Sequence, residues 1–138
     1  MTLRLVEARR YADGAIQHAN SLGIKVGVVV VDELGQLVQM DRMDGARLMA
    51  PDIAEAKALT ALNFQQPTSA VAAQFAANPT GLAALQEIVK FKLFARPGGV
   101  PIVRDGVIAG AIGVSGGTPE QDEEVATASL SSSSQLSS

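Results

Sequence analysis

Residues 100–117 read Val-Pro-Ile-Val-Arg-Asp-Gly-Val-Ile-Ala-Gly-Ala-Ile-Gly-Val-Ser-Gly-Gly, and this stretch decides the fold. Two apolar runs flank Arg104-Asp105-Gly106, where the glycine can adopt a positive φ, so the stretch predicts a hairpin of two antiparallel strands. Gly110 and Gly113 leave bare backbone on the second strand. Such glycines indicate that a helix, a ligand or another subunit approaches the strand closely.

A helix is predicted directly after this hairpin. Thr118 is a natural N-cap, Pro119 suits the first helical position, and Gln121 completes a capping box. Acidic residues fill the first turn, namely Glu120, Asp122 and Glu123. No G-x-G-x-x-G or G-x-x-x-x-G-K-[ST] pattern fits residues 110–118, and the carboxylates would repel a phosphate, so we exclude nucleotide binding at this loop.

The remaining chain predicts a mixed α/β (α+β) architecture. Apolar residues recur at helical spacing over residues 3–22, and Gly23 ends that helix. A β-branched run over 26–31 and a second strand over 36–42 flank a turn at 32–35. Further helices begin at Pro51 and Pro67, and residues 89–94 alternate like a strand that enters the central hairpin. This order predicts a five-stranded antiparallel sheet with helices packed on it.

Composition limits the function. The 138 residues are 47% hydrophobic and 18% charged, which describes a soluble globular chain, and we expect one domain over 1–130 with a serine-rich tail over 131–138. The net charge of −3 offers no basic surface, so nucleic acid is not an expected partner. No apolar run approaches the roughly 20 residues that span a bilayer, so we expect a cytoplasmic protein without a membrane partner. There is no cysteine and one histidine, which predicts no metal site built from several such ligands.

Lys57 is the most informative charged residue. It falls inside the apolar arc of the helix that begins at Pro51, and an unpaired buried ammonium costs several kcal/mol. The lysine must therefore line a cavity, extend its ammonium to solvent or pair with a carboxylate. We predict that Lys57, Arg42, Asp122 and Glu123 converge on one pocket beside Gly98 and Gly99. A structural ion pair for Lys57 is an equal alternative, and a solvated charge cluster is the alternative for Arg42 and its neighbours Asp41 and Asp44.

Four ordered motifs resemble the GlcG/HbpS family, which includes the C-terminal domain of PduO-type proteins. The resemblance covers most of residues 3–130. It implies a profilin-like arrangement, with helices on both faces of the five-stranded sheet and assembly into homo-oligomers from dimer to octamer. The motifs are Val-Val-Asp-Glu-Leu-Gly at 30–35, Asp-Arg-Met-Asp-Gly-Ala at 41–46, Ile-Ala-Glu-Ala-Lys-Ala-Leu-Thr-Ala at 53–61, and Gly-Gly-Val-Pro-Ile at 98–102 with the glycine-rich and acidic residues at 110–117 and 120–123.

The resemblance also implies a small-molecule ligand, either haem or a related tetrapyrrole, or cobalamin as in the PduO-type relatives. Haem iron takes histidine, cysteine, methionine or tyrosine as axial ligand. The candidates here are His18, Tyr11, Met40, Met43 and Met49, and none stands in a haem motif. Arg42 and Arg47 are candidates for the propionates, and Asp44, Gly98, Gly99 and Pro101 complete the expected ligand-binding set.

Two other classes of function stay open. Relatives that lie in catabolic gene clusters suggest a small-molecule enzyme, in which Lys57, Arg42, Asp122 and Glu123 would supply acid–base chemistry with Asp44. A desolvated lysine can have a pKa low enough to act as a base. The third class is a non-catalytic sensor or assembly protein, and the sequence does not decide whether the protein is an enzyme.

Overall fold

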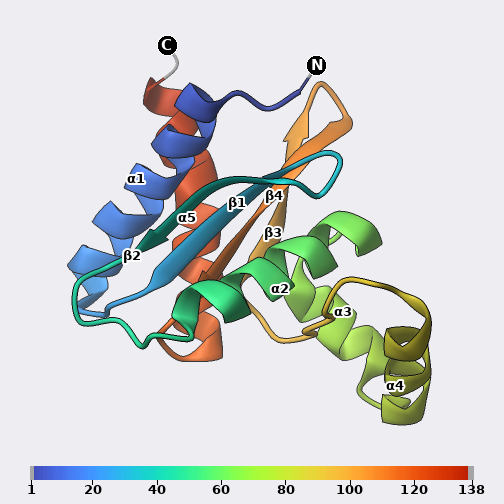
Figure 1. Ribbon diagram of the computed structural model, residues 1–138. Coiled ribbons are helices and arrows are strands. Elements are labelled where there is room, and N and C mark those ends of the chain that lie inside the picture. Colours follow the sequence, from blue (N-terminus) through green and yellow to red (C-terminus); the bar gives the residue numbers. More distant parts are fainter. Residues whose placement is uncertain (1, 137–138) are drawn as a thin grey trace.

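The structure is a computed structural model that describes residues 2–136, with side chains as far as Ser131. Its elements are, in chain order, α1 (Leu5–Leu22), β1 (Gly27–Asp32), β2 (Leu37–Arg42), α2 (Ala50–Phe64), α3 (Thr68–Phe75), α4 (Pro79–Ile88), β3 (Gly99–Arg104), β4 (Val107–Ser115) and α5 (Pro119–Leu136) (Figure 1). The strands form one antiparallel sheet in the order β2-β1-β4-β3. Helices α1 and α5 cover one face of this sheet, and α2 covers the other (Figure 1).

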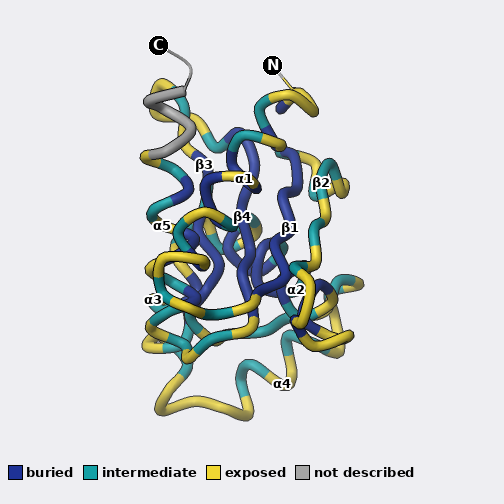
Figure 2. Tube along the Cα trace, turned by 90° about the vertical axis from the view of Figure 1, so that its left-hand side faces the viewer, coloured by how far each residue is buried: buried dark blue, intermediate teal, exposed yellow. Residues whose placement is uncertain are grey.

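Strand β1 forms the centre of the core. Val28 and Val30 pack against residues of α1 and α5, whereas Val29 and Val31 pack against α2, because successive side chains of a strand point to opposite faces. All six residues of β1 are buried, as the run of valines predicts. Figure 2 shows β1 and β4 as the buried interior between less buried helices.

The glycines of the central hairpin allow α2 to lie close to the sheet. A Cβ atom on Gly113 would collide with the carbonyl oxygen of Ala54, and one on Gly99 would collide with the carbonyl oxygen of Lys57. Both obstacles are backbone atoms of α2, which cannot rotate away. Close approach at Gly113 was expected from the sequence, and the structure identifies the approaching element as a helix.

The prediction of a fifth strand is wrong. The segment 89–94 alternates in polarity but does not pair with another strand in the part of the chain that the structure describes. Instead, the Gln86 side chain donates to the carbonyl oxygen of Phe91 at 2.8 Å and accepts from the amide of Leu93 at 2.7 Å. The Thr60 hydroxyl accepts from the amide of Phe94 at 2.9 Å. Side chains thus bond to the backbone groups that would otherwise pair with a neighbouring strand.

The division of the chain into a domain over 1–130 and a serine-rich tail stays a prediction. Helix α5 continues through the serines and ends at Leu136, and residues 137–138 lie outside the described part of the chain. At its other end α5 begins as predicted, since Thr118 and Gln121 form the capping box with contacts of 2.9 and 3.2 Å. None of the helices over residues 2–136 is long and apolar enough to cross a membrane.

Candidate functional site

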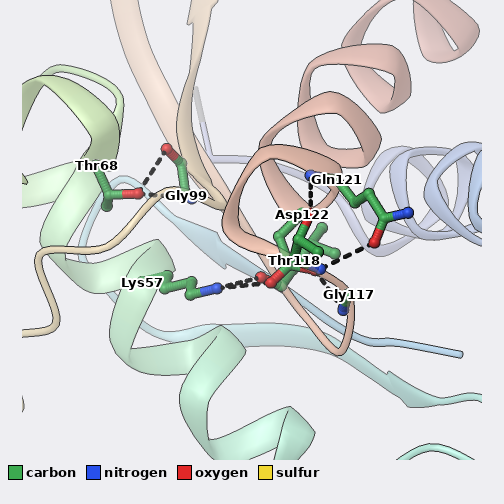
Figure 3. A network of polar contacts seen from close by, with 8 residues as sticks. Lys57, Thr68, Gly99, Gly117, Thr118, Gln121 and Asp122 are labelled. Atoms are coloured by element: carbon green, nitrogen blue, oxygen red, sulfur yellow. Dashed lines mark hydrogen bonds and ion pairs between the residues drawn. The ribbon is translucent and has the colours of Figure 1, made fainter. Parts of the chain in front are cut away.

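The candidate site is built around a buried ion pair between Lys57 of α2 and Asp122 of α5. The ammonium Nζ lies 3.0 Å from Asp122 Oδ2 and also donates to the carbonyl oxygen of Val114 at 2.9 Å (Figure 3). Each of the two charged side chains is 4% exposed. The pair therefore joins α2, the end of β4 and the start of α5 at one point.

Burial dominates the electrostatics of this pair. It lowers the pKa of Lys57, an effect that the charge of Asp122 partly offsets and that of Arg96 increases. Burial likewise raises the pKa of Asp122, against the opposing effects of Lys57 and of the amides of Gly117 and Gly116. Both shifts follow from the cost of moving a charge out of water.

The turn before α5 is arranged by the same carboxylate. Asp122 Oδ1 accepts a hydrogen bond from the amide of Gly117 at 2.8 Å, while its other oxygen faces Lys57 (Figure 3). Gly98 lies against the pair with φ at 131°, and a Cβ atom there would be 2.8 Å from Lys57 Nζ and 3.0 Å from the Asp122 Cβ. Glycine is thus required at 98 for both its backbone conformation and the closeness of the pair.

A small hollow of about 160 Å³ opens beside this turn. Ser115, which follows the carbonyl bonded to Lys57, forms one wall, and Ile53, one helical turn before Lys57, forms another. Arg47 and Met49 contribute a guanidinium and a thioether to the rim. The volume lies below the roughly 300–1,000 Å³ of typical small-molecule sites, so this hollow does not enclose a tetrapyrrole.

The structure brings together four of the predicted site residues, Lys57, Asp122, Gly98 and Gly99. It places Arg42 elsewhere, with its guanidinium donating to the carbonyl oxygen of Ala46 at 3.0 Å. Arg42 and Asp44 line a hollow of about 370 Å³ between α1 and the end of β2. Glu123 is one of the residues that line a third hollow along α5, and its Oε1 is buried without a hydrogen-bond partner among the described residues.

The remaining predicted ligand-binding residues lie in three other surroundings. Pro101 is half-buried in the edge strand β3. Tyr11 is buried in the core beside α5 and its hydroxyl bonds to Arg104. His18 is on the same helix but nearer the surface, where its Nε2 lies 2.6 Å from Glu124 Oε2. Tyr11 and His18 therefore have different partners, Arg104 and Glu124.

Sequence reasoning missed two features of this region. Thr68 starts α3, and its buried hydroxyl accepts from the amide of Gly99 at 2.9 Å, which fixes the loop beside Lys57 (Figure 3). A wider hollow of about 820 Å³ lies between the end of α2 and the two hairpin turns. It is lined by apolar side chains, including Leu59 and Leu62, together with polar ones such as Asn63 and Lys90, and no periodic pattern in the sequence marks it.

The chain belongs to the haem-degrading HbpS-like family, whose model matches residues 3–131. It is 37% identical over 139 residues to an uncharacterised 15.0 kDa protein of Citrobacter freundii from the dhaT-dhaS intergenic region, covering 98% of this chain and 94% of that protein. It is also 29% identical to the corrinoid adenosyltransferase PduO of the same organism, covering 94% of this chain. The chain spans only 38% of the length of that PduO.

Two solved structures share the fold over nearly the whole chain. The Klebsiella pneumoniae protein ORFY superimposes with a TM-score of 0.88 at 30% identity, covering 97% of this chain and 92% of that one. A complex of PduOC with heme superimposes with a TM-score of 0.85 at 28% identity, covering 96% of this chain and 95% of that one. Both structures have the fold of this chain, and the second of them is a complex with heme.

Proposed function

We propose that the protein binds haem or a related tetrapyrrole, with His18 as the ligand to iron. Membership of a family described as haem-degrading, together with similarity to a complex of PduOC with heme, supports the class of ligand. The observation that carries the proposal in this chain is the contact between His18 and Glu124. The similarity to PduO makes a corrinoid the second candidate ligand.

The five candidate iron ligands differ in how accessible their donor atoms are. Tyr11 is buried and bonded to Arg104, and Met43 Sδ accepts from the amide of Val26 at 3.4 Å. Met40 and Met49 are exposed. His18 is 32% exposed in its side chain and is the stronger ligand type among the accessible ones, because imidazole is the usual axial ligand of haem proteins.

The contact of His18 with Glu124 prepares an imidazole for metal binding. A carboxylate only accepts hydrogen bonds, so the nitrogen that faces Glu124 carries the proton, and in the neutral imidazole the other ring nitrogen keeps its lone pair. Histidines that bind metals commonly donate their second nitrogen to a carboxylate in this way, which fixes the orientation of the ring. Bound haem would supply the redox-active iron, and His18 with Glu124 would hold it.

The two arginines predicted to bind the haem propionates, Arg42 and Arg47, do not lie beside His18. Arg42 shares its hollow with Ile16 and Asn20 of α1, which lie about half a helical turn away from His18 around the axis. Arg47 lines the small hollow beside α2. His18 and Glu124 are therefore the residues that we propose for binding the haem iron. The binding of propionates by Arg42 and Arg47 stays a separate prediction.

The proposal of acid–base catalysis by Lys57 has less support. Its ammonium is closed to solvent and already has two partners, Asp122 and the carbonyl oxygen of Val114. A substrate could reach it only after the ion pair opened. The catalytic roles of Lys57, Arg42, Asp122 and Glu123 stay predictions, as do the sensor and assembly alternatives.

Titration of the purified protein with haemin tests the proposal. We expect a saturable shift of the Soret band at micromolar protein, lost or strongly weakened in His18→Ala and reduced in Glu124→Gln. Met49→Leu is the matched control, because it removes the more exposed of the two accessible methionines and should leave the shift unchanged. A spectrum that equals free haemin plus protein at stoichiometric concentrations contradicts haem binding, and a normal shift in His18→Ala with loss in Met49→Leu reassigns the ligand.

A further inference from the structure

The small hollow beside the turn before α5 contains a hydroxyl group that no other part of the site uses. Ser115 lines this hollow of about 160 Å³ and is only 8% exposed. Its hydroxyl forms no hydrogen bond with another group of the described residues. Buried polar side chains are normally hydrogen-bonded, so a buried hydroxyl that faces a hollow without a partner indicates a ligand there.

The Ser115 side chain faces the first turn of α2. Val114 packs on the side of the sheet that α1 and α5 cover, so its neighbour Ser115 points to the opposite side. Across the sheet, Ser115 is paired with Gly27. A Cβ atom on Gly27 would lie 2.7 Å from the nitrogen of Pro51 and 2.8 Å from the carbonyl carbon of Ala50. The start of α2 therefore lies directly beside Ser115.

This start of α2 is electrostatically positive. Its N-cap residue, Met49, provides no side-chain cap, Pro51 has no N–H group, and the amide of Asp52 has no backbone partner among the described residues. The uncapped amides and the aligned peptide dipoles favour an anion at a helix start. Arg47 adds a full positive charge at the rim, and it forms no ion pair with a described carboxylate.

The carboxylates near the hollow do not cancel this positive charge. Asp122 accepts from the amide of Gly117, which lines the hollow, but its own charge is already paired with Lys57. Asp52 is exposed and does not line the hollow. The groups that do line it are therefore neutral or positive.

We propose that this hollow binds the carboxylate group of a short aliphatic acid such as propionate. One carboxylate oxygen accepts from the Ser115 hydroxyl, while Arg47 and the positive end of α2 balance the charge. Met49, Ala50 and Ile53 form apolar walls that suit an alkyl chain better than a phosphate or sulfate. The volume of about 160 Å³ limits the acid to a few carbon atoms.

The same carboxylate chemistry occurs in the propionate groups of a tetrapyrrole. His18, the iron ligand that we propose, belongs to α1, which covers the face of the sheet opposite to α2 (Figure 1). A free acid is therefore the expected ligand of the hollow. This proposal does not rest on haem binding, and its test separates the two sources of the carboxylate.

Titration of the isotope-labelled protein with sodium propionate, followed in amide NMR spectra, tests the proposal. Sodium chloride at the same ionic strength is the reference. We expect saturable shifts of the amide signals of Ser115, Gly116 and Gly117 at millimolar propionate. Propionamide has nearly the same shape but no charge, and we expect it to bind at least about tenfold more weakly, since hydrogen bonds to charged groups are the stronger ones.

Two variants and two matched controls assign the binding groups. Ser115→Ala should weaken propionate binding about tenfold, because it removes a hydrogen bond to a charged group. Arg47→Gln should weaken it by a smaller factor, because an exposed charge is screened by solvent. Ser129→Ala removes a buried hydroxyl that bonds elsewhere, to the carbonyl oxygen of Ala126, and Arg9→Gln removes an exposed arginine of α1. Both controls should keep the wild-type affinity, and the same spectra show that each variant is folded.

The absence of a saturable shift at residues 115–117 overturns the proposal, as does equal binding of propionamide. Unchanged affinity in a folded Ser115→Ala variant also overturns it. Displacement of propionate by stoichiometric haemin would overturn the assignment to a free acid, since the hollow would then take a propionate group of the tetrapyrrole. Failure of haemin to bind the protein at all would contradict the proposed function and leave the expected propionate shifts in place.

Discussion

The ammonium of Lys57 lies 3.0 Å from the carboxylate of Asp122, and both side chains are closed to solvent. The two residues belong to helices on opposite faces of the sheet, and they meet beyond the end of β4, where Lys57 also reaches the carbonyl oxygen of Val114. This contact joins α5 to α2 across the sheet. Its contribution to stability can be measured directly.

Replacing Lys57 by methionine should destabilise the fold. Methionine keeps the volume but leaves the Asp122 carboxylate buried without its cation, and breaking a buried pair in this way costs about 3–5 kcal/mol. Urea unfolding at neutral pH measures the difference in free energy of unfolding. If Lys57 were instead a catalytic group, the same variant would fold almost as stably as the wild type and lose turnover.

The double variant Lys57→Met with Asp122→Asn provides the control for this prediction. Asparagine removes the charge and keeps an oxygen that can accept from the amide of Gly117, a contact of 2.8 Å in the native protein. Because neutral replacement of a whole buried pair is often tolerated, we expect most of the lost stability to return. A double variant that is less stable than the single one would show that the pair is not the unit responsible.

Part of the free energy of unfolding should depend on pH through Glu7. Burial pushes the pKa of Glu7 upward, but the bond from the amide of Arg4 at 2.9 Å and the ion pair with Arg104 outweigh it and hold the pKa below the ordinary value of 4.5. The folded state therefore favours the charged form. This contribution is complete above about pH 4.5 and is lost as the pH falls through the lowered pKa.

The variant Glu7→Gln keeps an oxygen for Arg4 and removes the charge. We expect it to be less stable than the wild type at neutral pH by about 1 kcal/mol or less, since the pair is partly exposed and screened by solvent. The difference should close as the pH falls below 4.5. Urea midpoints of both proteins over that range give the measurement, and a gap that widens in acid would contradict the assignment.

Gly113→Ala should be among the most damaging single changes. The added methyl would collide with the carbonyl oxygen of Ala54 and lie 2.9 Å from the amide nitrogen of Ala58, both in the backbone of α2. The helix would have to move away from the sheet, and overpacking of this kind costs about 1–3 kcal/mol or more. Thermal unfolding should show a clear fall in Tm.

Gly81→Ala is the comparison for Gly113→Ala. Its methyl would meet only the side chain of Asn78, which caps α4 by accepting from the amide of Gly81 at 3.0 Å. That side chain can turn away, so the expected loss is that of a helix cap, about 1 kcal/mol. Equal losses in the two variants would mean that contact with the α2 backbone is not the cause.

Local patterns in the sequence predict most of the elements. The hairpin at 100–115, the capping box at Thr118 and the buried valine strand each depend on neighbouring residues, and each is present. The fifth strand could not be excluded in this way. Its absence depends on Gln86 and Thr60, side chains from other segments that occupy the backbone groups of 91–94.

The candidate site was predictable only where a physical requirement forced a contact. A lysine on an apolar helix face needs a carboxylate, and Asp122 was among the few candidates held in place by a helix start. No such requirement applied to Arg42 or Glu123, whose positions depend on where the end of β2 and the outer side of α5 lie in space. The partner of His18 could not be found from spacing, since Glu124 is separated from it by 106 positions.

Helix α4 has no buried residue, and the segment that follows it is held chiefly by the one side chain of Gln86. Opening this part would expose apolar side chains that are only half-buried, such as Leu82, Leu85 and Phe91, and would leave the sheet and its three covering helices intact. Stability in a protein is distributed unevenly, and regions with few buried contacts open with the smallest free energy. Residues 79–93 are therefore where amide hydrogens should exchange first, where a protease should cut first, and where an inserted peptide would be carried with least effect on folding.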